Sequence, residues 1–331
     1  MIFHPPILAL ITAAMIAAVV LAGSGVFALR LLAHWDLDSG AERQIGLERA
    51  TTLVSTVVAF VLVLEAASLV LFAFNADRMA PLFVGAMCAV GTLNASIYGF
   101  PTLWAKIVVF FAAFAWLALD RVDGRTRDYA LIRVKYAGLL VLAPLVFIEG
   151  ALELAYFLDL KADTITSCCG KLFGEDKPAL GGDLASLDPF LAMGLVAGGL
   201  VVAIGLGFLV GRGRFFALAH GLASVAVFGL ALAAIVAAIA PYVYEQPHHH
   251  CPFCILKREY GHFGFALYLP LFLATGAGIS SAVLASVAPT SARAVAEVAT
   301  RRLGRLAIGG HVVFALVALA AVLTSRLTLV S

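Results

Sequence analysis

The stretch PFLAMGLVAGGLVVAIGLGFLV, residues 189–210, contains neither a charged nor a hydrogen-bonding side chain. A helix needs about 20 mainly apolar residues to cross the hydrocarbon core of a bilayer. Because backbone groups cannot be hydrated there, a run of this length predicts a membrane-spanning helix. Seven further segments fit the same description: 6–30, 51–74, 101–119, 137–156, 216–240, 263–287 and 306–323.

The composition supports the same conclusion for the whole chain. The 331 residues are 63% hydrophobic and 13% charged, whereas soluble domains average about 45–50% and about 25%. We therefore predict an all-α, polytopic transmembrane helix bundle with about eight spanning helices, forming a single integral membrane domain over 1–331. A ninth apolar run, 82–97, is short and contains Gly85, Gly91 and Asn94, which predicts one short interfacial or re-entrant helix.

The distribution of charge predicts an orientation. Most of the 22 basic residues lie in the loops after the first, third, fifth and seventh predicted helices, and such loops face the cytoplasm. The sequence thus predicts a multi-pass protein of the bacterial inner (cytoplasmic) membrane with both termini periplasmic. The net charge of +2 gives no reason to expect nucleic acid as a partner. Residues 158–188 and 242–262 become outer loops, and all five cysteines fall on the outer side, where disulfides persist.

The segment HHHCPFCILKR, residues 248–258, carries a Cys-x-x-Cys pair. Pro252 suits the first turn of a helix, so we expect the pair at the N-terminus of the seventh spanning helix. Amides at that position and the cations Lys257 and Arg258 favour a thiolate. A lowered thiol pKa makes the pair competent in disulfide exchange, with Cys251 as the attacking thiol.

Other interpretations of this segment stay open. Two thiolates, Cys251 and Cys254, together with imidazoles of His248, His249 and His250, would provide a tetrahedral Zn²⁺ set or a copper site. A structural disulfide within one helical turn is geometrically awkward. Haem attachment requires a histidine directly after the second cysteine, and the chain has an isoleucine there.

The sequence Cys251-x-x-Cys254-Ile255-x-x-Arg258 resembles the motif of the DsbB family of quinone-reducing, disulfide-forming membrane proteins. This resemblance implies that the cysteines form a quinone-coupled pair and that Arg258 lies beside the quinone. The cysteine order is also similar to that of the vitamin K epoxide reductase family, where an outer-loop pair precedes the Cys-x-x-Cys. That similarity implies Cys168 and Cys169 as the loop pair. The chain departs from both families in its larger number of helices and in its adjacent loop cysteines.

The remaining cysteines admit several pairings. Adjacent cysteines such as Cys168 and Cys169 close only a strained ring, and strain makes a disulfide easier to reduce. That property suits an electron shuttle, but a loop staple, or pairing with Cys88 or the Cys-x-x-Cys, is also compatible with the sequence. Taken by itself, Cys88 is expected to be a packed, inert thiol.

Ionisable residues within predicted membrane helices point to function by default. Glu65 lies near the middle of the second helix, and Glu149 and Glu153 share one face of the fourth. Quinone reduction consumes protons, so these three carboxylates form a candidate proton relay. The alternative is a structural ion pair, for example with Lys106.

These observations favour an inner-membrane thiol–disulfide oxidoreductase. Electrons from a periplasmic thiol or redox protein would enter at Cys168/Cys169, pass to Cys251/Cys254 and reduce a membrane quinone. One alternative is a membrane protein that binds or transports Cu or Zn. Another is a non-catalytic membrane anchor for a periplasmic redox partner. The distance between the two cysteine groups in the folded chain should distinguish the two functions. Cysteines within disulfide reach of each other favour exchange, whereas imidazoles and thiolates around one point favour metal binding.

Overall fold

The computed structural model describes residues 4–36, 42–126, 128–161, 164–166 and 186–327. In these ranges eight helices are long and apolar enough to cross a membrane. Their only β structure is an isolated bridge between Val84 and Ile165. The protein is therefore an all-α, multi-pass membrane protein in contact with lipid, as the apolar runs predict.

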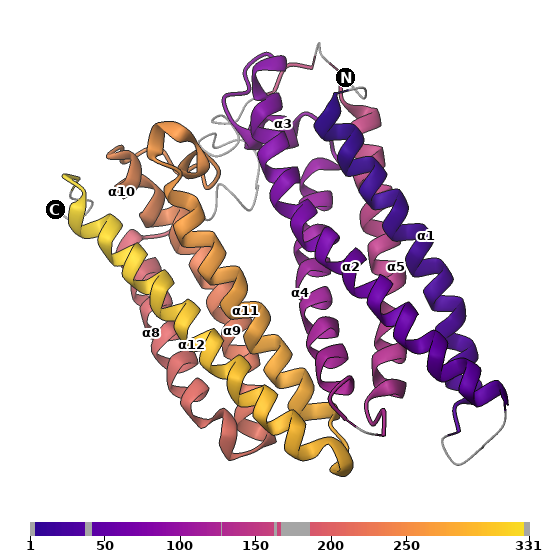
Figure 1. The fold of residues 1–331 in the computed structure, drawn as a ribbon. Helices are drawn as coiled ribbons and strands as arrows, with labels where there is room; N and C mark the ends of the chain where they lie inside the picture. Colours follow the sequence, from indigo (N-terminus) through magenta and orange to yellow (C-terminus); the bar gives the residue numbers. More distant parts are fainter. Residues whose placement is uncertain (1–3, 37–41, 127, 162–163, 167–185, 328–331) are drawn as a thin grey trace. The chain divides into compact units, whose positions relative to one another are not determined.

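The described residues form two compact units. Unit 1 comprises residues within 1–75, 95–162 and 287–299, and unit 2 comprises those within 76–94, 163–286 and 300–331. The long helices of unit 1 are α1 (Pro5–His34), most of α2 (Glu42–Met79), α4 (Gly99–Asp123) and α5 (Ile132–Asp159) (Figure 1).

The helices of unit 1 bury one continuous apolar core. Leu21 of α1, Leu62 of α2, Ala113 of α4 and Leu139 of α5 are all at most 1% exposed and belong to a single cluster. Each helix is longer than the apolar run that predicts it, because polar residues at both ends continue the backbone hydrogen bonding beyond the hydrocarbon core. The four-helix core gives polar side chains on its inner faces a rigid, water-poor setting.

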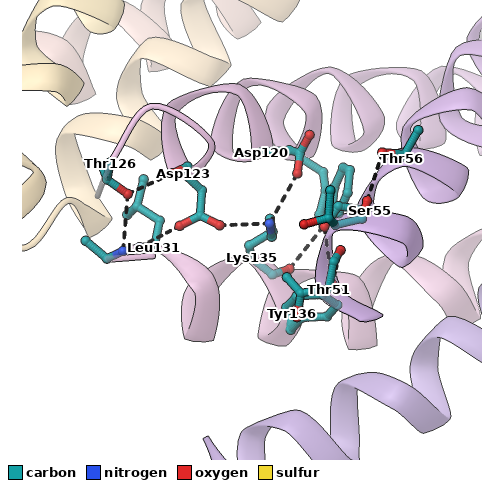
Figure 2. A network of polar contacts seen from close by, with 12 residues as sticks. Thr51, Ser55, Thr56, Asp120, Asp123, Thr126, Leu131, Lys135 and Tyr136 are labelled. Carbon is teal, nitrogen blue, oxygen red and sulfur yellow. Dashed lines mark hydrogen bonds and ion pairs between the residues drawn. The ribbon is translucent and has the colours of Figure 1, made fainter. Parts of the chain in front are cut away.

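One end of α4 and α5 is joined by a polar network (Figure 2). Lys135 Nζ lies 2.8 Å from Asp123 Oδ2 and 3.2 Å from Asp120 Oδ1. Asp123 Oδ1 also accepts a hydrogen bond of 3.0 Å from the amide of Leu131, at the turn between the helices. The Tyr136 hydroxyl extends the contacts to α2, where it donates to the carbonyl of Thr51. The network fixes the turn that leads from α4 into α5.

Unit 2 contains the other spanning helices and the short elements around them. It comprises the 3₁₀ turn Ala80–Leu82, α3 (Ala89–Asn94), α8 (Pro189–Leu209), α9 (Arg214–Ala234), a π-helical segment (Ile235–Ile239), α10 (Ala240–Tyr244), α11 (Phe263–Val287) and most of α12 (Arg293–Thr324). Helix α8 begins where the sequence predicts, because Pro189 occupies its first turn and Asp188 Oδ1 accepts the Leu191 amide. The predicted short helix within 82–97 is the six-residue α3.

Small residues bring α9 and α11 close together. A Cβ added to Gly221 would lie 2.5 Å from the Cβ of Ala282, and one added to Gly278 would clash with Ser224. Membrane helices gain van der Waals contact at such positions, since lipid offers no hydrophobic driving force for association. The α9–α11 pair is therefore closely packed below the connection between α10 and α11, residues 245–262.

Candidate functional site

Three cysteine thiols of unit 2 converge at one point. The Sγ atoms of Cys88, Cys251 and Cys254 all lie within 4.8 Å of one another, and those of Cys88 and Cys251 are 3.4 Å apart. All three are free thiols, with exposed fractions of 1%, 4% and 7%. Cys88 directly precedes α3, whereas Cys251 and Cys254 belong to the connection between α10 and α11. We name this group the thiol cluster.

Side chains from the neighbouring helices hold the backbone around Cys251. The Tyr244 hydroxyl at the end of α10 donates to the Cys251 carbonyl at 2.5 Å, and the Tyr268 hydroxyl of α11 donates to the Pro252 carbonyl at 2.7 Å. His250 Nδ1 lies 2.9 Å from the carbonyl of Val236 in the π-helical segment. Because a carbonyl only accepts, this ring nitrogen must carry the proton.

The segment that carries Cys88 is fixed to the same loop. Lys257 Nζ donates to the Met87 carbonyl at 2.6 Å and lies 3.6 Å from Asp77 Oδ1. On its other side, Thr166 donates from its amide to Val84 and from its hydroxyl to Gly91, each at 2.9 Å. The alignment of the thiols thus depends on contacts between segments that are far apart in the sequence.

Gly85 is required by this arrangement. Its φ of +86° is in a region that side chains with a Cβ rarely adopt, and an added Cβ would overlap the carbonyl oxygen of Thr166. The backbone of the Cys88 segment and the backbone at Thr166 can therefore approach each other only with glycine at this position.

The thiols have unequal acidities. Hydrogen bonds from the Cys254 and Cys88 thiols, with further help from the amides of Phe253 and Cys254, hold the pKa of Cys251 well below its ordinary value. The same contacts raise the pKa of Cys254 and of Cys88, since each acts as a donor to Cys251. The cluster therefore favours a single thiolate, at Cys251, with two thiols directed at it.

Lys257 is the cation that interacts electrostatically with the cysteines of the thiol cluster. Burial opposes its charged form, but the charges around it, led by Asp77, outweigh burial and raise its pKa. Arg258, the cation that the DsbB resemblance implies beside a quinone, is exposed on the 3₁₀ turn Arg258–Tyr260. Its predicted role toward a quinone stays a prediction.

The expected position of the Cys-x-x-Cys at the start of a spanning helix is wrong. Helix α11 begins at Phe263, and Cys254 instead opens the single 3₁₀ turn Cys254–Leu256. Gly261 and His262 both have positive φ, which interrupts any continuous helix between the cysteines and α11. Amides still stabilise the Cys251 thiolate, but they belong to the tight turn after it rather than to the end of a long helix.

The histidine triplet does not join the thiols. His248 is exposed, and the His249 ring stacks on Tyr244 with 4.0 Å between ring centroids. His250 is directed to Val236, as described above. Within the described residues, the group of potential metal ligands that lie close together consists of the three cysteines. A two-cysteine, two-histidine zinc set, as the sequence suggested, is not assembled there.

Two other sets of predicted residues complete the comparison with the sequence. Cys168 and Cys169 lie outside the described residues. Glu65, Glu149 and Glu153 do come together, around Lys106, in unit 1. The sequence suggested Cys88 as a packed thiol or as a partner of Cys168 or Cys169, not as a neighbour of Cys251. Its presence on the same predicted side as the Cys-x-x-Cys was the one available signal for the thiol cluster.

The fold and the site define a class: a multi-pass helical membrane protein with a buried cluster of three thiols. Comparison of the chain with protein-family models, with curated proteins and with solved structures found no match. The function must therefore be argued from the chemistry of the chain itself.

Proposed function

We propose that this protein is a membrane thiol–disulfide oxidoreductase whose reactive centre is the thiol cluster. The observation that supports the proposal is the 3.4 Å separation of the Cys88 and Cys251 sulfurs, with Cys254 in the same group. Disulfide exchange requires a thiolate beside a second sulfur, with a third sulfur as leaving group. Cys251 is the common neighbour, so it is able to form a disulfide with either of the other two cysteines.

The proposed cycle is balanced in atoms and electrons. A thiolate of a partner dithiol attacks the Cys251–Cys254 disulfide, the sulfur–sulfur bond breaks, and a mixed disulfide forms. The second partner thiol resolves it, so the partner becomes a disulfide and the two cysteines become thiols. A quinone then accepts two electrons and two protons, becomes a quinol and restores the Cys251–Cys254 disulfide. Cys88 exchanges with Cys251 internally, without net oxidation.

In the complete route the partner dithiol first reduces a Cys168–Cys169 disulfide, and the two thiols so formed take the partner's place in the exchange with Cys251–Cys254, as the similarity to the vitamin K epoxide reductase family implies. Thr166, two residues before Cys168 in the sequence, donates a hydrogen bond to Gly91, three residues after Cys88. This attachment supports exchange between the loop pair and the thiol cluster. In this proposal the cluster faces the periplasm of a bacterial inner membrane, and Arg258 stabilises the developing charge on the quinone.

Binding of a soft metal ion is the second candidate function. Three thiolates around one ion, at about 2.3 Å each, would be separated by about 4 Å, so the thiol cluster could hold Cu or Zn. Against this, closed zinc sites have four protein ligands, and the histidines expected to complete the set are directed elsewhere. The metal hypothesis and the exchange hypothesis make opposite statements about the oxidation state of the purified protein.

A trapping experiment tests the proposal. In Cys254→Ser, mild oxidation should yield a Cys88–Cys251 disulfide, which peptide mapping by mass spectrometry without reductant would identify. The matched control Cys88→Ser should instead retain the Cys251–Cys254 disulfide, and the double variant should show neither. A soluble ubiquinone analogue should oxidise the reduced wild type, with one quinol formed per disulfide.

A different outcome of the same experiments would refute the exchange proposal. If all three cysteines of the wild type remain alkylatable after treatment with oxidant, and purified protein carries a stoichiometric metal ion that thiol alkylation displaces, the exchange proposal fails. In that case the thiol cluster is a metal site.

A further inference from the structure

A second cluster of ionisable side chains lies inside unit 1, between α2, α4 and α5. Lys106 Nζ is 2.5 Å from Glu149 Oε1, 3.0 Å from Glu153 Oε2 and 3.0 Å from Ser68 Oγ. Ser68 Oγ is in turn 3.3 Å from Glu65 Oε2. All the charged members are in the interior of the unit: Glu149 and Glu153 are 0% exposed, Lys106 2% and Glu65 3%.

The charges of this cluster do not balance. The Lys106 ammonium donates a hydrogen bond to Ser68 and forms ion pairs with Glu149 and Glu153. One positive charge faces three carboxyl groups, so a fully ionised cluster would leave two negative charges in a water-poor core. An unpaired buried charge costs several kcal/mol even after relaxation, and such a group binds a proton instead.

The hydrogen-bond geometry gives an independent indication. Glu149 Oε2 and Glu153 Oε1 are buried and have no hydrogen-bond partner among the described residues, which is a costly state for an ionised carboxylate. Glu65 Oε1 is buried and has no hydrogen-bond partner among the described residues. A bare carboxylate oxygen in that setting is costly, whereas a protonated Glu65 loses its charge.

We propose that Glu65, Glu149 and Glu153 form an intramembrane proton-binding site that holds two protons, with Lys106 as its fixed cation. One proton is held by either Glu149 or Glu153, and the other is on Glu65. The ligand of the site is the proton itself, since Lys106 already occupies the position where a metal cation would meet the carboxylates. The proposal does not depend on the chemistry of the thiol cluster, which belongs to unit 2.

The charge balance predicts how the number of protons changes in variants. Removing one carboxylate, in Glu153→Gln or Glu65→Gln, should leave one protonated group. Removing the cation, in Lys106→Met, should increase the number to three, because no positive charge then remains to balance an ionised carboxylate. A purely structural ion pair, with all carboxyl groups ionised, predicts no protonated group in any of these proteins.

Infrared spectroscopy of the purified full-length protein in lipid nanodiscs measures these numbers. Protonated carboxyl groups have a carbonyl stretch that is distinct from the carboxylate bands and shifts in D₂O. At neutral pH its intensity should halve in Glu153→Gln and rise by about half in Lys106→Met. Asp120→Asn is the matched control, since Asp120 also contacts a lysine of unit 1 but is 26% exposed; it should leave the intensity unchanged.

Carbodiimide labelling of the wild type keeps the test decisive if a variant does not fold. Carbodiimides modify protonated carboxyl groups in apolar surroundings, so mass spectrometry should find adducts on Glu65, Glu149 or Glu153. Absence of both the protonated-carboxyl band and these adducts in the wild type would overturn the proposal. A band that is unchanged in Glu65→Gln and Glu153→Gln would overturn it as well.

Discussion

Replacing Cys88 with alanine should raise the pKa of Cys251 and slow its reactions at neutral pH. The Cys88 sulfur is 3.4 Å from that of Cys251 and is one of the two thiols that hydrogen-bond to it. A hydrogen bond to a charged group contributes about 1.5–3 kcal/mol, and S–H is a weak donor, so the lower end applies. With 1.36 kcal/mol per unit, the pKa of Cys251 should rise by about one unit.

The sign of the effect on reactivity follows from the thiolate being the nucleophile. A higher pKa lowers the thiolate fraction at pH 7, so alkylation of Cys251 should slow by up to about tenfold. The pH titration of thiolate ultraviolet absorbance in the reduced protein gives the midpoint, and mass spectrometry gives the alkylation rate at Cys251. Cys88→Ser retains a donor and should fall between Cys88→Ala and the wild type. Identical midpoints in Cys88→Ala and the wild type would refute the hydrogen-bond argument.

Three further results are expected. Lys257→Met should raise the thiol pKa values, since this cation favours the thiolates. Arg258→Met should leave the thiol pKa values unchanged and reduce only the rate of quinone-coupled oxidation. If the two variants changed the thiol pKa values and the oxidation rate equally, the separation of roles would be contradicted. Gly85→Ala should lower the thermal unfolding temperature and disrupt the thiol cluster, because the added Cβ would overlap the Thr166 carbonyl. In the control Gly46→Ala the added Cβ meets open space in a helix, so the free energy of unfolding should be unchanged or about 1 kcal/mol higher. Finally, a membrane-impermeant thiol reagent should label the three clustered cysteines in reduced, intact spheroplasts, where only the periplasmic side is accessible; labelling only in inside-out vesicles would contradict the predicted orientation.

The sequence alone was sufficient for the fold class and for most helix positions. Long apolar runs such as 189–210 have one stable solution in a bilayer, a helix that satisfies its own backbone, so their number and approximate bounds follow from composition. The Cys-x-x-Cys and the carboxylates inside the membrane were also identifiable, because polar chemistry is conspicuous in apolar surroundings. Helix α11, Phe263–Val287, has the bounds that the apolar run gave.

The tertiary structure decided which of these residues act together. Cys88 and Cys251 are 163 positions apart in the chain, and tertiary contacts such as the hydrogen bond from Lys257 to the Met87 carbonyl join their segments. A motif specifies residue types and local spacing, but convergence depends on packing between helices, which one segment of sequence does not contain. Likewise, Glu149 and Glu153 share a helix face by spacing alone, whereas the shortage of positive charge around Lys106 exists only because α2 adds Glu65 to the same buried site.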